Sequence, residues 1–318
     1  MGGYILRRTG QAVVVILGVV LFTFALARLV PGGEARAVLG PKATSTTIAL
    51  FNHRNGLDQP LIVQFWQYIQ GIVVHGNLGY SYKYNQGVAQ VIFERLPKTL
   101  VLVTVSVVLS LVIAVPLGIL QVVRRNKPSD YAITGAAFFL YAMPDFLVGT
   151  LLIIWFSFDL KLFPAAPPTD ASAWAVFTDP VAFVLPIVTL TVTSIAAFSR
   201  YMRSSMMEQL TQDYVRTARA KGASNRRVLY GHALRNALIP LITLLGLSLP
   251  AIVSGALIVE NVFNYPGMGL LTVQSAFNVD IPVVLGTTLV ITVATVLGSL
   301  LADIFYAVAD PRIRLGRS

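Results

Sequence analysis

Residues 208–240 read EQLTQDYVRTARAKGASNRRVLYGHALRNALIP, a polar and cationic stretch between two long apolar runs. Two segments rich in helix-forming residues meet at Gly222, Ala223 and Ser224. We therefore predict two short helices joined there, with Gly222 in the left-handed conformation that ends the first one. Because charges resist burial in lipid, the stretch is either a solvated cytoplasmic loop that obeys the positive-inside rule or a docking surface for a soluble partner.

The composition is that of a protein with several membrane spans. The 318 residues are 55% hydrophobic and 12% charged, whereas soluble domains have about 25% charged residues. Cytoplasmic loops that face anionic lipid explain the net charge of +10 better than nucleic-acid binding does. The absence of cysteine excludes disulfides, thiolate metal sites and cysteine nucleophiles.

Apolar runs of about 20 residues are long enough to cross a bilayer as helices. The runs cover residues 9–29, 99–123, 131–158, 181–199, 238–259 and 282–308. We therefore predict an all-α polytopic membrane protein with six transmembrane helices. Pro144 permits a kink in the third span. The first span is expected to stay uncleaved, because no small-residue cleavage site follows it.

The positions of Lys and Arg predict the orientation of the spans. With the N-terminus in the cytoplasm, 16 of the 24 Lys and Arg residues lie inside and 8 outside. The short outer loops then contain only Lys161, which is the asymmetry that the positive-inside rule predicts. Both termini are therefore expected to be cytoplasmic.

The chain divides into three predicted parts. Residues 1–97 hold the first helix and a long extracytoplasmic segment, and residues 98–308 hold five helices and the cytoplasmic loop 200–237. Residues 309–318 form a cytoplasmic tail. Within the outer parts we predict short helices near 44–54 and 60–74, a turn at 76–79 and a tight turn at 266–269.

Motifs for catalysis by the chain alone are missing from the sequence. It contains no GxxxxGK[ST] phosphate-binding loop, no HExxH and no GxSxG. The three histidines are scattered along the chain, which argues against a metal site. We expect no catalysis by the chain alone, and no metal or cofactor bound to it.

Few carboxylates lie within or beside the predicted spans. The candidates for a transport pathway or gate are Asp145, Glu260 and Asp303, together with Asn261 and Asn264. Asp145 follows Pro144 and could equally cap a helix at a break. A proton-coupled carrier usually has more ionisable groups at mid-span, which counts against a self-sufficient secondary carrier or channel.

Residues 214–222, YVRTARAKG, and 232–237, HALRNA, resemble the coupling loop of permease subunits of bacterial ABC importers. The version is that of dipeptide, oligopeptide and nickel permeases. Aligned on Gly222, Ala218 alone matches the Glu-Ala-Ala triplet of the general signature, and Leu234 alone matches its Ile-x-Leu-Pro element. Residues 76–81, 95–99, 260–269 and 310–312 resemble segments of the B-type subunit of the same branch.

This resemblance, which covers essentially the full chain, implies a type I ABC importer permease fold in the bacterial cytoplasmic (inner) membrane. The chain would form half of the pathway of a di-/oligopeptide importer; nickel or another small solute is the alternative within the branch. The implied partners are a homologous second permease subunit (C-type), two ATPase subunits or domains that bind ATP and Mg, an extracytoplasmic substrate-binding protein, a peptide substrate and membrane lipid. A membrane scaffold whose basic loop only recruits a protein is a further alternative.

The resemblance also implies which residues couple the pathway to the ATPases. They are Tyr214, Arg216, Thr217, Ala218, Arg219, Ala220, Lys221, Gly222, Ala223 and Arg226. Each arginine could instead face solvent or lipid headgroups. His232 and Asn236 share one helical face beside Arg235, and we expect these three to brace the loop by hydrogen bonds rather than to act in catalysis.

Overall fold

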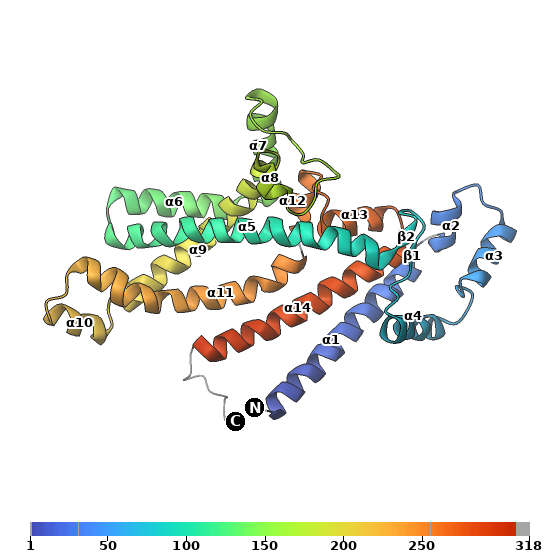
Figure 1. Ribbon diagram of the computed structural model, residues 1–318, viewed down its shortest axis with the longest axis horizontal. Coiled ribbons are helices and arrows are strands. Elements are labelled where there is room, and N and C mark those ends of the chain that lie inside the picture. Colours follow the sequence, from blue (N-terminus) through green and yellow to red (C-terminus); the bar gives the residue numbers. More distant parts are fainter. Residues whose placement is uncertain (1, 31, 255, 310–318) are drawn as a thin grey trace.

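Long apolar runs become long helices, because a backbone in lipid must satisfy its polar groups within its own segment. The computed structural model describes residues 2–30, 32–254 and 256–309. Its longest helices are α1 (Gly2–Arg28), α5 (Val88–Val123), α9 (Val184–Gln209), α11 (Leu234–Ser254) and α14 (Ile281–Ala309). Helix α9 packs on α5 and α11, α11 packs on α14, and α14 packs on α1 at the edge of the molecule (Figure 1).

Several of these helices have the length and apolarity of membrane spans. Within the described residues they are Arg7–Arg28, Val88–Val123, Pro180–Gln209 and Ile281–Leu300, and a bent pair could form a fifth span. The run predicted as the fifth span, 238–259, divides between α11 and the short helix α12 (Leu257–Val262). The number of six spans and the cytoplasmic termini therefore stay predictions.

The run predicted as the third span, 131–158, changes direction in its middle. Helix α6 (Pro128–Ala142) ends before Pro144. Helix α7 (Asp145–Leu152) continues into the π-helical η1 (Ile153–Asp159), and this segment lies at 101° to α6. Pro144 has no N–H to donate and pushes the preceding residue away from the helical region. Met143 accordingly has an extended backbone, with φ −77° and ψ 130°. Helix α7 thus points away from α5 and α6 (Figure 1), a sharper change than a kink.

The segment between α1 and α5 confirms the two predicted short helices. They are α3 (Ser45–Arg54) and α4 (Leu61–His75), and a helix that was not predicted, α2 (Gly33–Leu39), precedes them. The Thr44 hydroxyl caps α3 by accepting a hydrogen bond from the N–H of Thr47 at 3.2 Å. The turn at 76–79 leads into an antiparallel pair of short strands, β1 (Tyr80–Ser81) and β2 (Gln86–Gly87).

Three further short elements lie between longer helices of the described chain. They are α8 (Ala175–Thr178), the 3-10 helix η2 (Pro180–Phe183) and α13 (Met268–Phe277).

A buried apolar cluster joins α5, α9 and α11. It consists of Ala114, Ile119, Val122, Phe198, Met202, Met206, Ala233, Ala237 and Leu241. Gly118 lets α5 approach α9 closely, because a Cβ at this position would lie 2.6 Å from the Cβ of Met202 and 3.0 Å from the carbonyl oxygen of Ser199. The Ser205 hydroxyl of α9 donates a hydrogen bond to the carbonyl oxygen of Ala237 at 2.9 Å, which fixes α11 against the same helix.

We predict that Gly118→Ala lowers the apparent melting temperature of the detergent-solubilised protein. The added methyl group must displace Met202 or the backbone near Ser199, and overpacking of this kind costs about 1–3 kcal/mol. Gly135→Ala in α6 is the matched control, since a Cβ there has no neighbouring atom within 4 Å. An unchanged melting temperature for Gly118→Ala would show that this close approach does not hold α5 and α9 together.

Candidate functional site

The predicted coupling loop forms a short helix, α10 (Asp213–Ala220), at the end of the molecule away from β1 and β2 (Figure 1). Gly222 has a φ of +81°, which confirms its predicted left-handed conformation. The N–H of Gly222 donates to the carbonyl oxygen of Arg219 at 2.9 Å, and the N–H of Ala223 donates to that of Ala218 at 3.0 Å. This pair of bonds is a Schellman motif, which satisfies the last carbonyls of the helix.

Buried apolar side chains anchor α10 to the rest of the chain. Val215 of α10 is fully buried, as is Val228 in the π-helical η3 (Arg227–Ala233) that follows the turn. The Tyr214 hydroxyl donates to Oε1 of Gln209, the last residue of α9, at 2.8 Å. Helix α10 is thus attached to the segments on either side of it, α9 and η3.

The opposite side of α10 and the turn after it are exposed and cationic. Arg216, Thr217, Arg219, Ala220, Lys221, Gly222 and Arg226 are exposed, and Tyr214, Ala218 and Ala223 are half-buried. Arg216 lies 3.5 Å from Asp213 in an exposed ion pair, which adds little stability in water. Within the described residues no carboxylate pairs with Arg219, Lys221 or Arg226. Their charges are thus available to an acidic partner.

The three residues expected to brace the loop lie in η3 and at the start of α11. His232 and Arg235 are exposed, and Asn236 is half-buried. None of their side chains forms a hydrogen bond with the part of the chain that the structure describes. The hydrogen bond from Ser205 to Ala237 joins α9 to α11 in this region. The bracing role of the three residues stays a prediction.

Glu260, a predicted pathway or gate residue, is fully buried and accepts hydrogen bonds at both carboxylate oxygens. The Thr99 hydroxyl of α5 donates to Oε1 at 2.6 Å, and the N–H groups of Gly269 and Leu270 donate to Oε2 at 2.7 and 3.1 Å. Thr99 in turn accepts a hydrogen bond from the N–H of Met268 at 2.8 Å. The carboxylate therefore caps the N-terminus of α13 and ties it to α5.

The glycines of the predicted tight turn make room for this carboxylate. A Cβ at Gly267 would lie 2.5 Å from the carboxyl group of Glu260, and one at Gly269 would lie 2.5 Å from the Cα of Leu257. The hydroxyl of the buried Tyr265 donates to the carbonyl oxygen of Lys98 in α5 at 2.8 Å. The sequence ENVFNYPGMG thus encodes a buried helix cap.

The other predicted pathway residues are dispersed. The Asn261 amide donates to the carbonyl oxygen of Leu257 at 2.7 Å, and Asn264 is exposed with a φ of +47°. Asp145 is the half-buried first residue of α7, where a negative charge stabilises the helix. Asp303 lies in α14, but its side chain, like residues 310–318 of the predicted tail, lies outside the described residues. A pathway role for these residues stays a prediction.

Sequence analysis did not identify an ion pair that joins α6 to α9. Arg203 donates from Nε and Nη2 to the two carboxylate oxygens of Asp130, at 3.1 and 3.0 Å. The two residues are 73 positions apart. Asp130 has the ordinary pattern of an acid in the first turn of a helix, so the sequence offered no signal for the pairing.

Two acids near the end of α1 and the start of α14 were also missed. Glu34 and Asp280 line a small cavity of about 10 Å³, and burial raises the pKa of both carboxyl groups. Ser81 of β1 donates a hydrogen bond to Asp280, and Arg28 lies 3.6 Å from Glu34. These contacts fasten α2 and the strand pair to the long helices. Among the described residues no group of three or more His, Cys, Asp or Glu is placed to hold a metal ion.

Apolar helices of spanning length and an exposed cationic helix define an integral membrane protein. Residues 114–315 match the family described as "Binding-protein-dependent transport system inner membrane component", and residues 1–103 match the N-terminal component of such systems. The chain therefore belongs to the family of inner membrane components of binding-protein-dependent transport systems. This finding confirms the resemblance to importer permeases.

Relatives of this family match the chain over nearly its full length. It is 39% identical over 315 residues to the oligopeptide transport system permease protein AppB of Bacillus subtilis, which covers 98% of this chain and 99% of the relative. It is 37% identical over 319 residues to the glutathione transport system permease protein GsiC of Salmonella paratyphi A, with 99% of each chain covered.

A solved structure supports the fold alone. A chain of the MetNI methionine ABC transporter in an inward-facing conformation superimposes with a TM-score of 0.53 at 17% identity. The superposition covers 70% of this chain and 97% of that chain.

We predict that Glu260→Ala destabilises the protein by about 2–4 kcal/mol, because it leaves buried hydroxyl and N–H donors without an acceptor. Glu260→Gln keeps one carbonyl oxygen for the N–H groups and should cost less. The apparent melting temperature in detergent measures both effects, with Asn261→Ala as the control, since that amide bonds only within its own helix turn. Equal melting temperatures for Glu260→Ala and wild type would contradict the capping role.

Proposed function

We propose that this chain is one permease subunit of an ATP-driven importer of di- or oligopeptides. The observation that carries the proposal is the 39% identity, over 98% of the chain, with an oligopeptide permease protein. The glutathione permease relative is consistent with a short peptide as the transported solute, because glutathione is itself a tripeptide. The chain contributes half of the translocation pathway and no catalytic residue.

Helix α10 is the coupling element in this proposal. It docks in a groove of an ATPase partner, and its exposed cations pair with acids there. The Schellman cap keeps the helix short and rigid, and the anchors Val215 and Tyr214 pass its displacement to α9 as a rigid-body shift. ATP and Mg²⁺ are bound by the ATPases, and this chain needs no cofactor of its own.

The remaining assignments follow from this role. The chain crosses the bacterial inner membrane six times in a type I importer fold, with both termini and the loop 200–237 in the cytoplasm. A homologous C-type permease completes the pathway, and an extracytoplasmic binding protein delivers the peptide to the side that holds residues 30–97. The three-part division at residues 97 and 308 is retained, and nucleic acid has no part in the function.

The competing functions predict different partners. Nickel or another small solute in the same branch requires the same subunits, so only uptake assays with the candidate solutes separate it from peptide import. A self-sufficient carrier or channel needs no ATPase, and a scaffold would recruit a protein without transport.

We therefore expect that the protein, solubilised from its native membrane, co-purifies with a homologous permease and with ATPase subunits identified by mass spectrometry. A protein that purifies without partner subunits and still transports its solute into liposomes in the absence of ATP would instead support the carrier.

We predict that Gly222→Val lowers peptide uptake at least about tenfold while membrane insertion stays intact. A β-branched residue is strained at a φ of +81° and disrupts the Schellman cap of α10. Gly231→Val is the matched control, because a Cβ at that exposed position would meet only the Cγ of Arg227, at 3.8 Å. Uptake by Gly222→Val at the wild-type rate would refute the coupling assignment at this position.

A further inference from the structure

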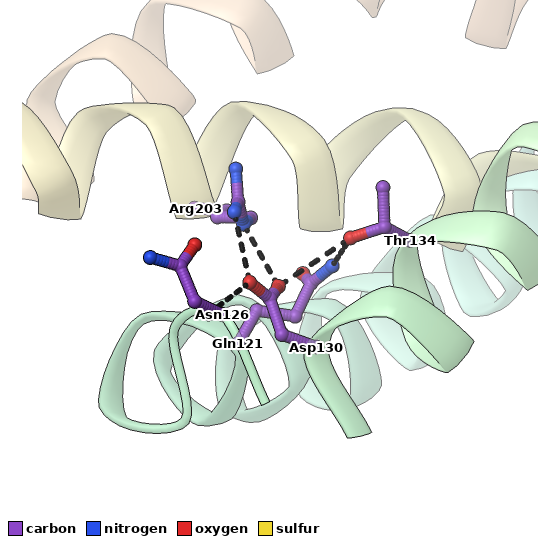
Figure 2. Close-up of polar contacts among 5 residues, drawn as sticks. All are labelled: Gln121, Asn126, Asp130, Thr134 and Arg203. Carbon is purple, nitrogen blue, oxygen red and sulfur yellow. Dashed lines mark hydrogen bonds and ion pairs between the residues drawn. The ribbon is translucent and has the colours of Figure 1, made fainter. Parts of the chain in front are cut away.

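The Asp130–Arg203 pair lies where the turn between α5 and α6 meets α9 (Figure 2). Asp130 is 2% exposed, and the Arg203 side chain is 29% exposed. Figure 2 shows dashed lines that join the Arg203 side chain, beside α9, to the carboxylate of Asp130 on α6. The pair joins two helices that are far apart in the sequence.

Every contact of the Asp130 carboxylate fixes its position. Besides the two bonds from Arg203, it accepts a hydrogen bond from the N–H of Asn126 at 3.1 Å and one from the Thr134 hydroxyl at 3.4 Å. The Gln121 amide of α5 donates to the Thr134 hydroxyl at 3.0 Å. A bidentate arginine–carboxylate pair sets orientation as well as distance. The end of α5, the turn and the start of α6 are thus held to α9 as one unit.

Arg203 lies near the C-terminal end of α9, close to two other side chains that connect this helix to its neighbours. Three side chains in residues 203–209 connect α9 to three different elements. Arg203 binds α6, Ser205 binds the carbonyl oxygen of Ala237 in α11, and Gln209 accepts the hydrogen bond from Tyr214 in α10. The last turns of α9 are therefore the junction through which a movement of α10 reaches the long helices.

We propose that Asp130 and Arg203 form a positioning joint that carries the displacement of α10 into the α5–α6 hairpin. The inference rests on the proposed function of α10 and names the next step in the transmission. The chain runs from α6 through the break at Pro144 into α7, where Gly149 allows close packing, since a Cβ there would lie 3.1 Å from the Phe263 ring. A shift of α6 at the joint is thus passed toward α7 and α12.

A joint and a purely structural ion pair have different consequences when they are broken. Loss of a structural pair lowers thermal stability but leaves the peptide imported per ATP hydrolysed unchanged in the complexes that assemble. Loss of a joint lowers that ratio, because the ATPases still close on α10 while the hairpin no longer follows. The ratio is therefore the measurement that separates the two roles.

The experiment uses the complete transporter, with its partner subunits and binding protein, reconstituted in liposomes. Asp130→Asn and Arg203→Gln are expected to keep ATP hydrolysis and to lower the peptide imported per ATP about tenfold, within the range of coupling between distant sites. Arg203→Lys keeps the charge but loses the bidentate geometry, so it should give an intermediate ratio. Arg125→Gln removes an exposed cation from the same turn and should give the wild-type ratio.

A covalent replacement of the pair provides the second test. The chain contains no cysteine, so a short bifunctional thiol-reactive cross-linker, a bis-methanethiosulfonate, applied to the double variant Asp130→Cys/Arg203→Cys reacts at these two positions alone in this subunit. Bridging is expected to restore the ratio, whereas each single-cysteine variant treated with the same reagent should stay uncoupled.

The outcomes distinguish the joint from the proposed function on which it rests. Wild-type ratios in Asp130→Asn and Arg203→Gln, or a bridged double variant that stays uncoupled, would overturn the joint. If Asp130→Asn fails to assemble, Arg203→Lys and the bridged variant decide the question, because each keeps the two helices connected. A wild-type complex whose uptake does not depend on ATP would instead refute the proposed function itself.

Discussion

Helix α5 and the turn that follows it contact two buried carboxylates whose hydrogen bonds must be complete, because an unpaired charge away from water is costly. About a third of the way along α5, Glu260 binds Thr99 and the N-terminus of α13. Beyond the C-terminal end of α5, Asp130 binds Arg203 of α9 and the backbone of the turn. Between these two fixed points, apolar packing and the small side of Gly118 bring α5 and α9 together. The two acids therefore set the register of the helices that the remaining elements pack against.

The proposed coupling helix α10 has one attached side and one exposed side. Val215 and Tyr214 attach α10 to its neighbours, and the cations on the opposite side stay exposed. An exposed charge contributes little to folding stability. The residues on this side can therefore differ to suit a partner without destabilising the protein. The π-helical start of the next segment, η3, lies directly after the turn, and such stretches are frequent at functional sites.

Local physical rules explain what the sequence could predict. Apolar runs predicted the long helices, and Gly222 predicted the end of α10. Contacts between distant residues had no such signal: Asp130 pairs with a residue 73 positions away, and Glu260 meets a hydroxyl 161 positions away. Pro144 indicated a break, but the 101° change of direction depends on what α7 packs against. The sequence also could not show which of the candidate pathway acids is buried, since burial and hydrogen bonding depend on tertiary structure.

If α10 binds a partner subunit as proposed, its cap also bears on how fast the two can assemble. Its two hydrogen bonds join residues between Ala218 and Ala223, so they need no contact from another protein in order to form. A partner thus meets a finished helix and does not have to order a flexible loop at the moment of encounter. The loss of conformational entropy, about 1–2 kcal/mol for each backbone residue fixed, has already occurred during folding. Preorganisation of this kind allows a modest contact area to hold a complex together.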